Sequence, residues 1–372
     1  MAVTRATETG TCALVFTINH AVMDELSSRT IDADIVSSLS GGTMCEKVSW
    51  SLFANAYRCY MSSLPAQEAI VTHLARFRGI VQLRASLWPQ AAKPKKTANL
   101  LTTTISPSSS SSSSSNNNKN NSKAQEAVEM QNFTLSHTQA RTIPSLYHTY
   151  QAHDIRPAII TKTAIVLFNA SQTRTGTALL GIALSGRGWP FILDPLSTFL
   201  PSPHLIAGPA VSMCTDVVVL DAEESVGQLL TRLDAEQRIL TRYSHCVLGP
   251  IVEGLSEQDR LVWARARKRI FNWLPFEDYV KYPTNADGID VLRLLVNRGS
   301  KVDEPIDEFF WRCSMVATPG GEQRLKIEVE TIRDIFDEEE LKDIVGRLFE
   351  MVEKLTDEEN SGRNVGEILG NA

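Results

Sequence analysis

The chain has 372 residues, 43% of them hydrophobic and 22% charged, which is enough for two packed lobes that share a core. Its formal net charge of −6 at pH 7 gives no general attraction to nucleic acid or to an anionic membrane, so neither is expected as a partner. The first ten residues are polar, and no apolar run approaches the roughly 20 residues that span a bilayer. We therefore expect a globular, cytoplasmic protein.

Cysteine and histidine spacing indicates neither a disulfide framework nor a metal site. No CxxC pair occurs, so free and mostly buried thiols in the cytosol are the simplest interpretation. The cysteines are Cys12, Cys45, Cys59, Cys214, Cys246 and Cys313. The histidines other than His20 lack metal-ligand spacing, and we interpret them as solvated or core residues. They are His73, His137, His148, His153, His204 and His245.

The first element expected along the chain is a buried strand followed by a loop and a helix. The segment from Cys12 to Ile18 is rich in β-forming residues and leads directly to His20. Ser27 or Ser28 is expected to cap the helix, and the Gly pair 41–42 is expected to stop it. Its apolar positions are Ile31, Ile35, Val36 and Leu39.

A change of composition divides the chain. A run of serines from Ser108 to Ser115 continues into asparagines, and such a tract has no apolar side chains to offset the entropy of ordering its backbone. We predict a disordered linker over residues 90–129. It separates a partial N-terminal lobe (1–89) from a C-terminal lobe (130–360), which is followed by a tail (361–372).

Helices and strands alternate after the linker, which predicts an α/β fold. The expected elements are a helix from Pro157, a strand from Thr177 to Leu184, a turn at Gly208-Pro209, a strand from Val211 to Leu220 and a helix started by Ser225. Near the end, segments 311–318 and 324–329 flank Pro319-Gly320-Gly321 as a hairpin. A helical stripe then runs from Leu341 to Leu355, with acidic residues before it that suit a helix N-terminus.

The candidate catalytic residues are His20 and Asp24, which directly follow the first buried strand. A histidine acts as a general base when an exposed ring nitrogen is held within hydrogen-bond reach of the nucleophile, and a strand end supplies that rigidity. An aspartate four residues later can brace the loop through an arginine and leave the imidazole free. On spacing alone, a loop histidine with no catalytic role is the more common outcome.

The order of the motifs resembles that of condensation domains of nonribosomal peptide synthetases. The stretch Asn19-His20-Ala-Val-Met-Asp24-Glu25 is similar to their His-His-x-x-x-Asp-Gly motif, in a form that resembles fungal members. Residues 160–187 resemble the helix and strand that end in Ser-Gly-Arg. Leu205-Ile-Ala-Gly-Pro209-Ala-Val resembles the segment with Val-Gly-Pro, and Phe271-Asn272 resembles the later Phe-Asn turn.

This resemblance implies an α/β fold of two lobes like those of chloramphenicol acetyltransferase, with substrates meeting between them. It implies an acyltransferase of secondary metabolism, such as mycotoxin biosynthesis, that forms an amide or ester bond. Its donor and acceptor would be aminoacyl or peptidyl groups bound to carrier proteins. His20 would orient or deprotonate the acceptor amine, and Asp24 would hold the shape of the loop. The substrates would arrive on phosphopantetheine arms of carrier domains, and no metal or diffusible cofactor is implied.

The sequence also departs from that family. Asn19 replaces the first motif histidine, Glu25 replaces the closing glycine, and only 18 residues precede Asn19, so we expect the first lobe to be incomplete. It is open whether the arginine that pairs with the motif aspartate is present. Two alternatives stay open, an inactive condensation-domain fragment and a stand-alone acyltransferase that uses coenzyme A.

Two further patterns suggest other chemistry but have simpler interpretations. Ser185-Gly-Arg187 lacks the Gly-x-Ser-x-Gly elbow of a hydrolase serine. The basic run from Arg265 to Arg269 is short, and a solvated helix face is expected there rather than a nucleic-acid site.

Overall fold

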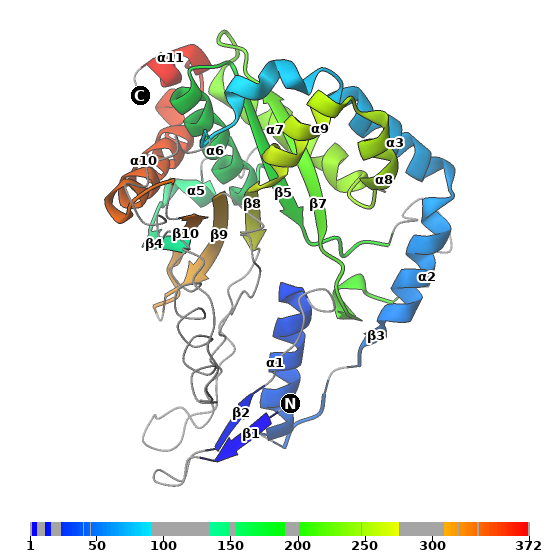
Figure 1. Ribbon diagram of the computed structural model, residues 1–372. Coiled ribbons are helices and arrows are strands. Elements are labelled where there is room, and N and C mark those ends of the chain that lie inside the picture. Colours follow the sequence, from blue (N-terminus) through cyan, green and yellow to red (C-terminus); the bar gives the residue numbers. More distant parts are fainter. Residues whose placement is uncertain are drawn as a thin grey trace, which may run out of the picture.

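A computed structural model describes residues 2–5, 12–15, 24–39, 41–44, 46–90, 134–148, 154–189, 201–246, 248–274, 309–318, 320–332 and 335–370. A mixed sheet lies at the centre, with helices on both of its faces (Figure 1). A small hairpin of β1 (Ala2–Arg5) and β2 (Cys12–Val15) lies at the lower end of the view. The predicted linker lies outside the described residues, apart from Gln90.

The central sheet has six strands in the order β4-β10-β9-β8-β5-β7. The strands are β4 (Thr134–Arg141), β5 (Thr177–Leu184), β7 (Ser212–Val219), β8 (Arg269–Leu274), β9 (Phe309–Ala317) and β10 (Gln323–Ile332). β8 runs parallel to both of its neighbours, and the other pairs are antiparallel. The predicted strands at 177–184 and 211–220 and the predicted hairpin are confirmed.

One face of the sheet is covered by α6 (Pro157–Thr173), α7 (Val226–Arg242) and α10 (Glu338–Thr356), together with the short α5 (Ser145–His148) and α11 (Val365–Gly370). The stripe predicted between Leu341 and Leu355 forms the buried side of α10. Ser225 caps α7 through a capping box with Gln228, and Asp337 caps α10 in the same way with Glu340. Local sequence signals thus set where these two helices begin.

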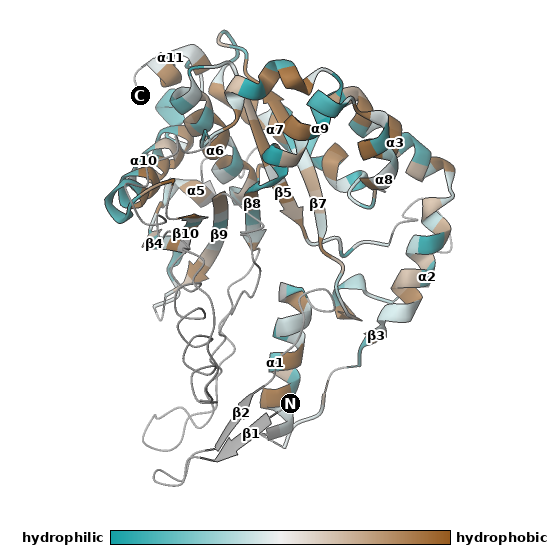
Figure 2. Ribbon diagram, viewed as in Figure 1, coloured by the Kyte–Doolittle hydropathy of each residue, from teal (hydrophilic) through white to brown (hydrophobic). Residues whose placement is uncertain are grey.

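The opposite face carries α3 (Leu64–Phe77), the 3-10 helix η2 (Ile80–Ser86), α8 (Leu248–Gly254) and α9 (Glu257–Arg267). Leu179 of β5 packs on this side, whereas Leu180 and Ile182 pack against the first set of helices. A strand buried on both faces has a continuous apolar sequence, which explains the uninterrupted run in β5. Figure 2 shows β5 in brown over most of its length.

A third, smaller cluster joins the N-terminal segments to the end of the sheet. It contains α1 (Glu25–Leu39), β3 (Val48–Ser49), α2 (Trp50–Met61), η5 (Pro203–Leu205) and β6 (Ile206–Ala207). β3 and β6 pair in parallel, and the apolar residues beneath them form a separate core. These core residues are Val48, Phe53, Trp189, Ile206 and Ala210. The last described segment before α11 is the 3-10 helix η6 (Glu358–Asn360).

Two details of the sequence prediction are wrong. The first helix is capped by Asp24 rather than by Ser27 or Ser28. α1 begins at Glu25, and the Asp24 carboxylate accepts the backbone N–H of Ser27 at 2.8 Å. The basic run is not entirely a solvated helix face. Arg269 is buried at the start of β8, where its Nε and Nη2 donate to the Pro89 carbonyl at 3.0 and 2.7 Å.

Candidate active site

Asp24 occupies a buried position at the N-terminus of α1. One carboxylate oxygen, Oδ1, accepts hydrogen bonds from the backbone N–H and from the hydroxyl of Ser27, each at 2.8 Å. The other oxygen, Oδ2, accepts the backbone N–H of Ala210 at 2.8 Å. The carboxylate therefore links the start of α1 to the segment that follows β6.

Arg187 is the ionic partner of Asp24. Its Nη2 lies 2.7 Å from Asp24 Oδ1, and its side chain is completely buried. The same nitrogen lies 2.8 Å from the Ser27 hydroxyl and 2.9 Å from the Gly208 carbonyl, while Nη1 donates to the Ile206 carbonyl at 2.7 Å. A planar guanidinium with several donors in fixed directions suits such a convergence of oxygens. Arg187 thus joins the exit of β5 to α1 and β6.

The segment Gly208-Pro209-Ala210 is held from both sides. On one side the Ser27 hydroxyl oxygen lies 2.7 Å from the Gly208 carbonyl oxygen, next to the ion pair. On the other side the Trp50 indole donates to the Pro209 carbonyl at 2.9 Å. Gly208 has a φ of +158°, and a Cβ there would lie 2.1 Å from Trp50 Cδ1. Glycine is therefore required at this position by both backbone conformation and space.

These contacts determine the charge state of Asp24. Burial by itself raises the pKa of a carboxyl group, but hydrogen bonds from Ala210, Ser27 and Arg187 outweigh it and hold the pKa of Asp24 below its usual value. Asp24 is consequently a charged, fully engaged side chain whose oxygens are all used in holding backbone segments. Such a group positions a loop and does not exchange protons.

A second histidine lies close to Arg187. His245 is enclosed by the rings of Phe53, Tyr57 and Tyr60, whose centroids lie between 6.0 and 6.3 Å from its own. Its Nε2 lies beside Gly188, and burial lowers the pKa of His245 below its usual value. The imidazole is thus held neutral within an aromatic cluster.

Of the two predicted catalytic residues, the structure describes Asp24 and not His20, which lies outside the described residues. The role of His20 stays a prediction. Sequence reasoning left the arginine partner of Asp24 unassigned, and the structure identifies it as Arg187, at the end of the Ser-Gly-Arg segment. The resemblance of Ser185-Gly-Arg187 to the family motif was the one feature of the sequence that could have indicated this arginine. Nothing in the sequence indicated that Ser27 and Trp50 would join the same site.

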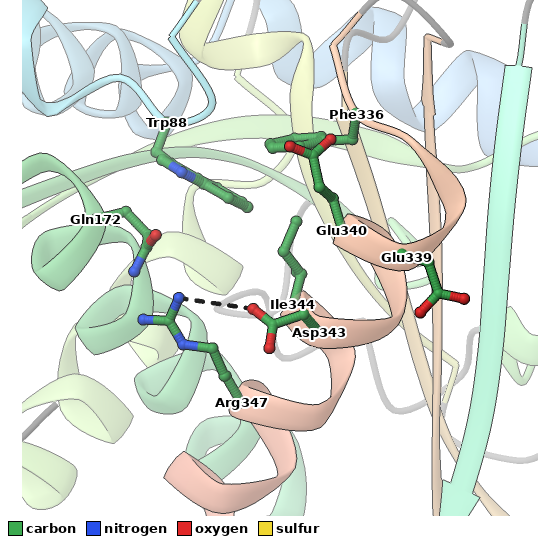
Figure 3. A pocket seen from close by; sticks show the side chains of 8 residues that line it. All are labelled: Trp88, Gln172, Phe336, Glu339, Glu340, Asp343, Ile344 and Arg347. Atoms are coloured by element: carbon green, nitrogen blue, oxygen red, sulfur yellow. Dashed lines mark ion pairs between the residues drawn. The ribbon is translucent and has the colours of Figure 1, made fainter.

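The open pocket drawn in Figure 3 shares no residue with this cluster. It has a volume of about 410 Å³ and is formed by Trp88, Gln172 and Phe336 together with one side of α10. The residues contributed by α10 are Glu339, Glu340, Asp343, Ile344 and Arg347. The Glu340 side chain takes part in capping α10, and Asp343 Oδ2 lies 3.9 Å from Arg347 Nη1. The pocket therefore belongs to a different part of the molecule from the predicted catalytic motif.

The described residues lack two features. No three histidine, cysteine, aspartate or glutamate side chains gather there in a way that suits a metal ion. Among the described helices, none combines the length and the hydropathy that crossing a bilayer requires.

Comparison with known proteins identifies the fold. No family model and no curated protein matches the sequence. Among solved structures, the chain is similar to the first condensation domain of the calcium-dependent antibiotic synthetase, with a TM-score of 0.57 and 12% identity over 94% of this chain. It is also similar to the starter condensation domain of rhizomide synthetase (TM-score 0.55, 15% identity, 93% of this chain and 66% of that one). A third similar structure is the epimerization domain from the third module of tyrocidine synthetase B (TM-score 0.51, 14% identity, 91% of this chain and 68% of that one).

This chain spans 64% of the length of the first of these domains. At such low identity the likeness concerns the fold, and it confirms the predicted mixed α/β arrangement of the condensation-domain type.

Proposed function

We propose that this chain, which has the fold of nonribosomal peptide synthetase condensation domains, acts as an acyltransferase that forms an amide or ester bond between carrier-bound substrates. The proposed partners are peptidyl or aminoacyl carrier domains, and the proposed setting is cytoplasmic secondary metabolism. The division into lobes at 1–89 and 130–360, joined by a linker over 90–129 and followed by a tail over 361–372, belongs to the same proposal.

The observation that carries this proposal is the buried pair of Asp24 and Arg187 at the Gly208 segment. Three blocks of the sequence that resemble the family motifs meet there, although they are far apart in the chain. Burying two charges costs desolvation free energy, so a buried ion pair adds little to the stability of a fold. Stability alone therefore does not explain why the pair is present. Because the ion pair fixes the backbone four residues after His20, it supports a positioning role for Asp24.

In the proposed reaction His20 takes the proton of the acceptor amine or hydroxyl. The new C–N or C–O bond forms at the thioester carbonyl, the C–S bond breaks, and the phosphopantetheine thiol leaves with a proton. A general base must have a free ring nitrogen, so this reaction requires that the Asp24 carboxylate bind other groups and not the His20 imidazole. The contacts of Asp24 with Arg187, Ser27 and Ala210 satisfy that requirement.

The test is single-turnover acyl transfer between loaded carrier proteins, with and without the variant His20→Ala. Loss of a positioned general base typically lowers the rate by about 10² to 10⁴, which is larger than the effect of modest misfolding. Asp24→Ala is expected to lower both the rate and the stability, since it removes the brace. His137→Ala on β4 is the matched control, because it removes a histidine from the far edge of the sheet.

Small probes separate the open alternatives. A mutant of the starter condensation domain of rhizomide synthetase is known in complex with C8-CoA and Leu-SNAC, and we propose these two molecules as carrier-free donor and acceptor probes for this chain. Transfer from C8-CoA but not from a loaded carrier would favour the coenzyme A alternative. Absence of transfer from either donor, in a chain that keeps its fold, would favour the inactive fragment and contradict the proposal.

A further inference from the structure

The open pocket beside α10 has an aromatic wall that is held firmly in place. Trp88 is only 8% exposed, and the ring centroids of Phe168, Phe309 and Phe336 lie 5.0, 4.9 and 5.6 Å from its own. Figure 3 shows Trp88 and Phe336 at the upper side of the pocket. Ile344 adds a largely buried aliphatic surface. The pocket thus presents a fixed apolar surface to a ligand.

This surface contains polar atoms without partners. The indole Nε1 of Trp88 donates to no acceptor within the described part of the chain. An indole N–H usually has an acceptor when its ring is buried. Gln172, on α6, also lines the pocket, and only its amide nitrogen has a neighbour among the described residues, the Ser171 hydroxyl at 3.3 Å. The pocket can therefore donate one hydrogen bond through Trp88 and accept another through the Gln172 carbonyl oxygen.

Three carboxylates border the pocket, and one of them has no cationic partner. Two lie at the limit of ion-pair distance from a cation on α10, with 3.9 Å between Asp343 and Arg347 and 4.0 Å between Glu339 and Lys342. Glu340 has no cation at ion-pair distance in the part of the chain that the structure describes, although its Oε2 accepts the backbone N–H of Asp337 at 2.8 Å. Figure 3 shows its side chain extending toward Phe336. A carboxylate beside aromatic rings suits an organic ammonium ion, which is attracted by both.

We propose that this pocket binds the N-terminus of a peptide that begins with an apolar residue. The ammonium group lies between the Glu340 carboxylate and the aromatic rings, and the first side chain packs on Ile344. The first carbonyl accepts the Trp88 N–H, and the following N–H donates to Gln172. The volume of about 410 Å³ is within the range of roughly 300 to 1,000 Å³ that is typical of small-molecule sites. The proposal is independent of the proposed acyl transfer, because this pocket and the Asp24 cluster have no residue in common.

The test is a ligand-observed NMR titration of the full chain with L-leucyl-glycinamide. The pH is about 6.5, where an α-amino group with an ordinary pKa of about 7.7 to 8.0 is mostly protonated. Association costs translational and rotational freedom, so the titration extends to about 10 mM. The matched control is N-acetyl-L-leucyl-glycinamide, which lacks the charge and should bind roughly 3 to 30 times more weakly. Equal binding of the two peptides, or binding of neither to the folded chain, would overturn the proposal.

A charge-removing variant tests the carboxylate. Glu340→Gln keeps the start of α10 intact, because glutamine supports the same capping box. We expect the affinity for L-leucyl-glycinamide to fall about two- to fivefold, which is the effect of one exposed charge pair. Glu338→Gln is the matched control, since it removes a charge from the same turn of α10 and does not line the pocket. An unchanged affinity in Glu340→Gln, or an equal loss in Glu338→Gln, would refute the assigned role of Glu340.

Two further variants test the hydrogen bonds. Trp88→Phe removes the indole N–H, and Gln172→Leu removes the amide oxygen without changing the aromatic wall. Each should weaken binding about two- to tenfold, which is the net effect of one hydrogen bond. Circular dichroism checks that each variant is folded, and Gln172→Leu carries the test if Trp88→Phe is not. Unchanged affinity in the folded variants would show that the peptide does not bind as proposed.

Discussion

The buried pair of Asp24 and Arg187 should show strong energetic coupling in a double-mutant cycle. Asp24→Asn keeps the size of the side chain but leaves a guanidinium buried beside a neutral amide, and the new NH₂ group faces either the N–H of Ala210 or Arg187 itself. Arg187→Met leaves the carboxylate buried with Ser27 and Ala210 as donors. Removing one partner of a buried ion pair typically costs about 3 to 5 kcal/mol. We expect each single variant to fall in that range.

The double variant Asp24→Asn/Arg187→Met contains neither charge, so its loss should be smaller than the sum of the two single losses. Side chains in direct contact show interaction energies of about 0.5 to 3 kcal/mol, and we expect a value near the upper limit because both groups are buried. The measurement is equilibrium unfolding in urea at pH 7, followed by circular dichroism. Additivity within about 0.5 kcal/mol would refute the coupling that we infer.

The pH dependence provides a second readout of the same pair. The pKa of Asp24 is lowered in the folded state, so its contribution is fully present above the unfolded value of 3.8 and disappears as the pH falls through the folded value. The difference in unfolding free energy between the parent chain and Asp24→Asn should therefore shrink below about pH 4. A difference that stays constant down to the acid-unfolding limit would contradict the assigned charge state.

Three further predictions concern two residues beside the site, Gly208 and Trp50, and a separate buried ion pair of Lys162 and Asp216. Gly208→Ala should lower the unfolding free energy by about 1 to 3 kcal/mol in urea titrations, since its Cβ would collide with Trp50, and an unchanged midpoint would contradict the required close approach. Trp50→Phe should cost only about 1 kcal/mol in the same assay, because it loses the hydrogen bond to Pro209 and keeps most of the packing. Lys162→Met should cost about 3 to 5 kcal/mol, since it leaves the buried Asp216 with one cationic partner fewer, and thermal melting with no shift would show that the pair is dispensable.

Local sequence patterns determined much of the central sheet and of the helices that cover it. The continuous apolar run of β5, the serine that caps α7 and the stripe of α10 are each set by residues within one element, so their periodicity and caps could be interpreted directly. The position of Asp24 in a motif after a strand was also visible in the sequence. The helices α2 and α3 were not predicted. Each has an apolar face, which packs in α3 against α8 and in α2 against a small separate core.

The partners of these residues were decided by the tertiary structure. Asp24 and Arg187 are 163 positions apart, and only the packing of α1 against β6 brings the carboxylate to the exit of β5. Arg269 looks like part of a solvated basic run, but it is buried because β8 continues directly from α9 into the sheet. Charged residues carry no periodic signal that reveals a distant counter-ion. A sequence therefore indicates which residues can hold a charge, and the fold determines what neutralises it.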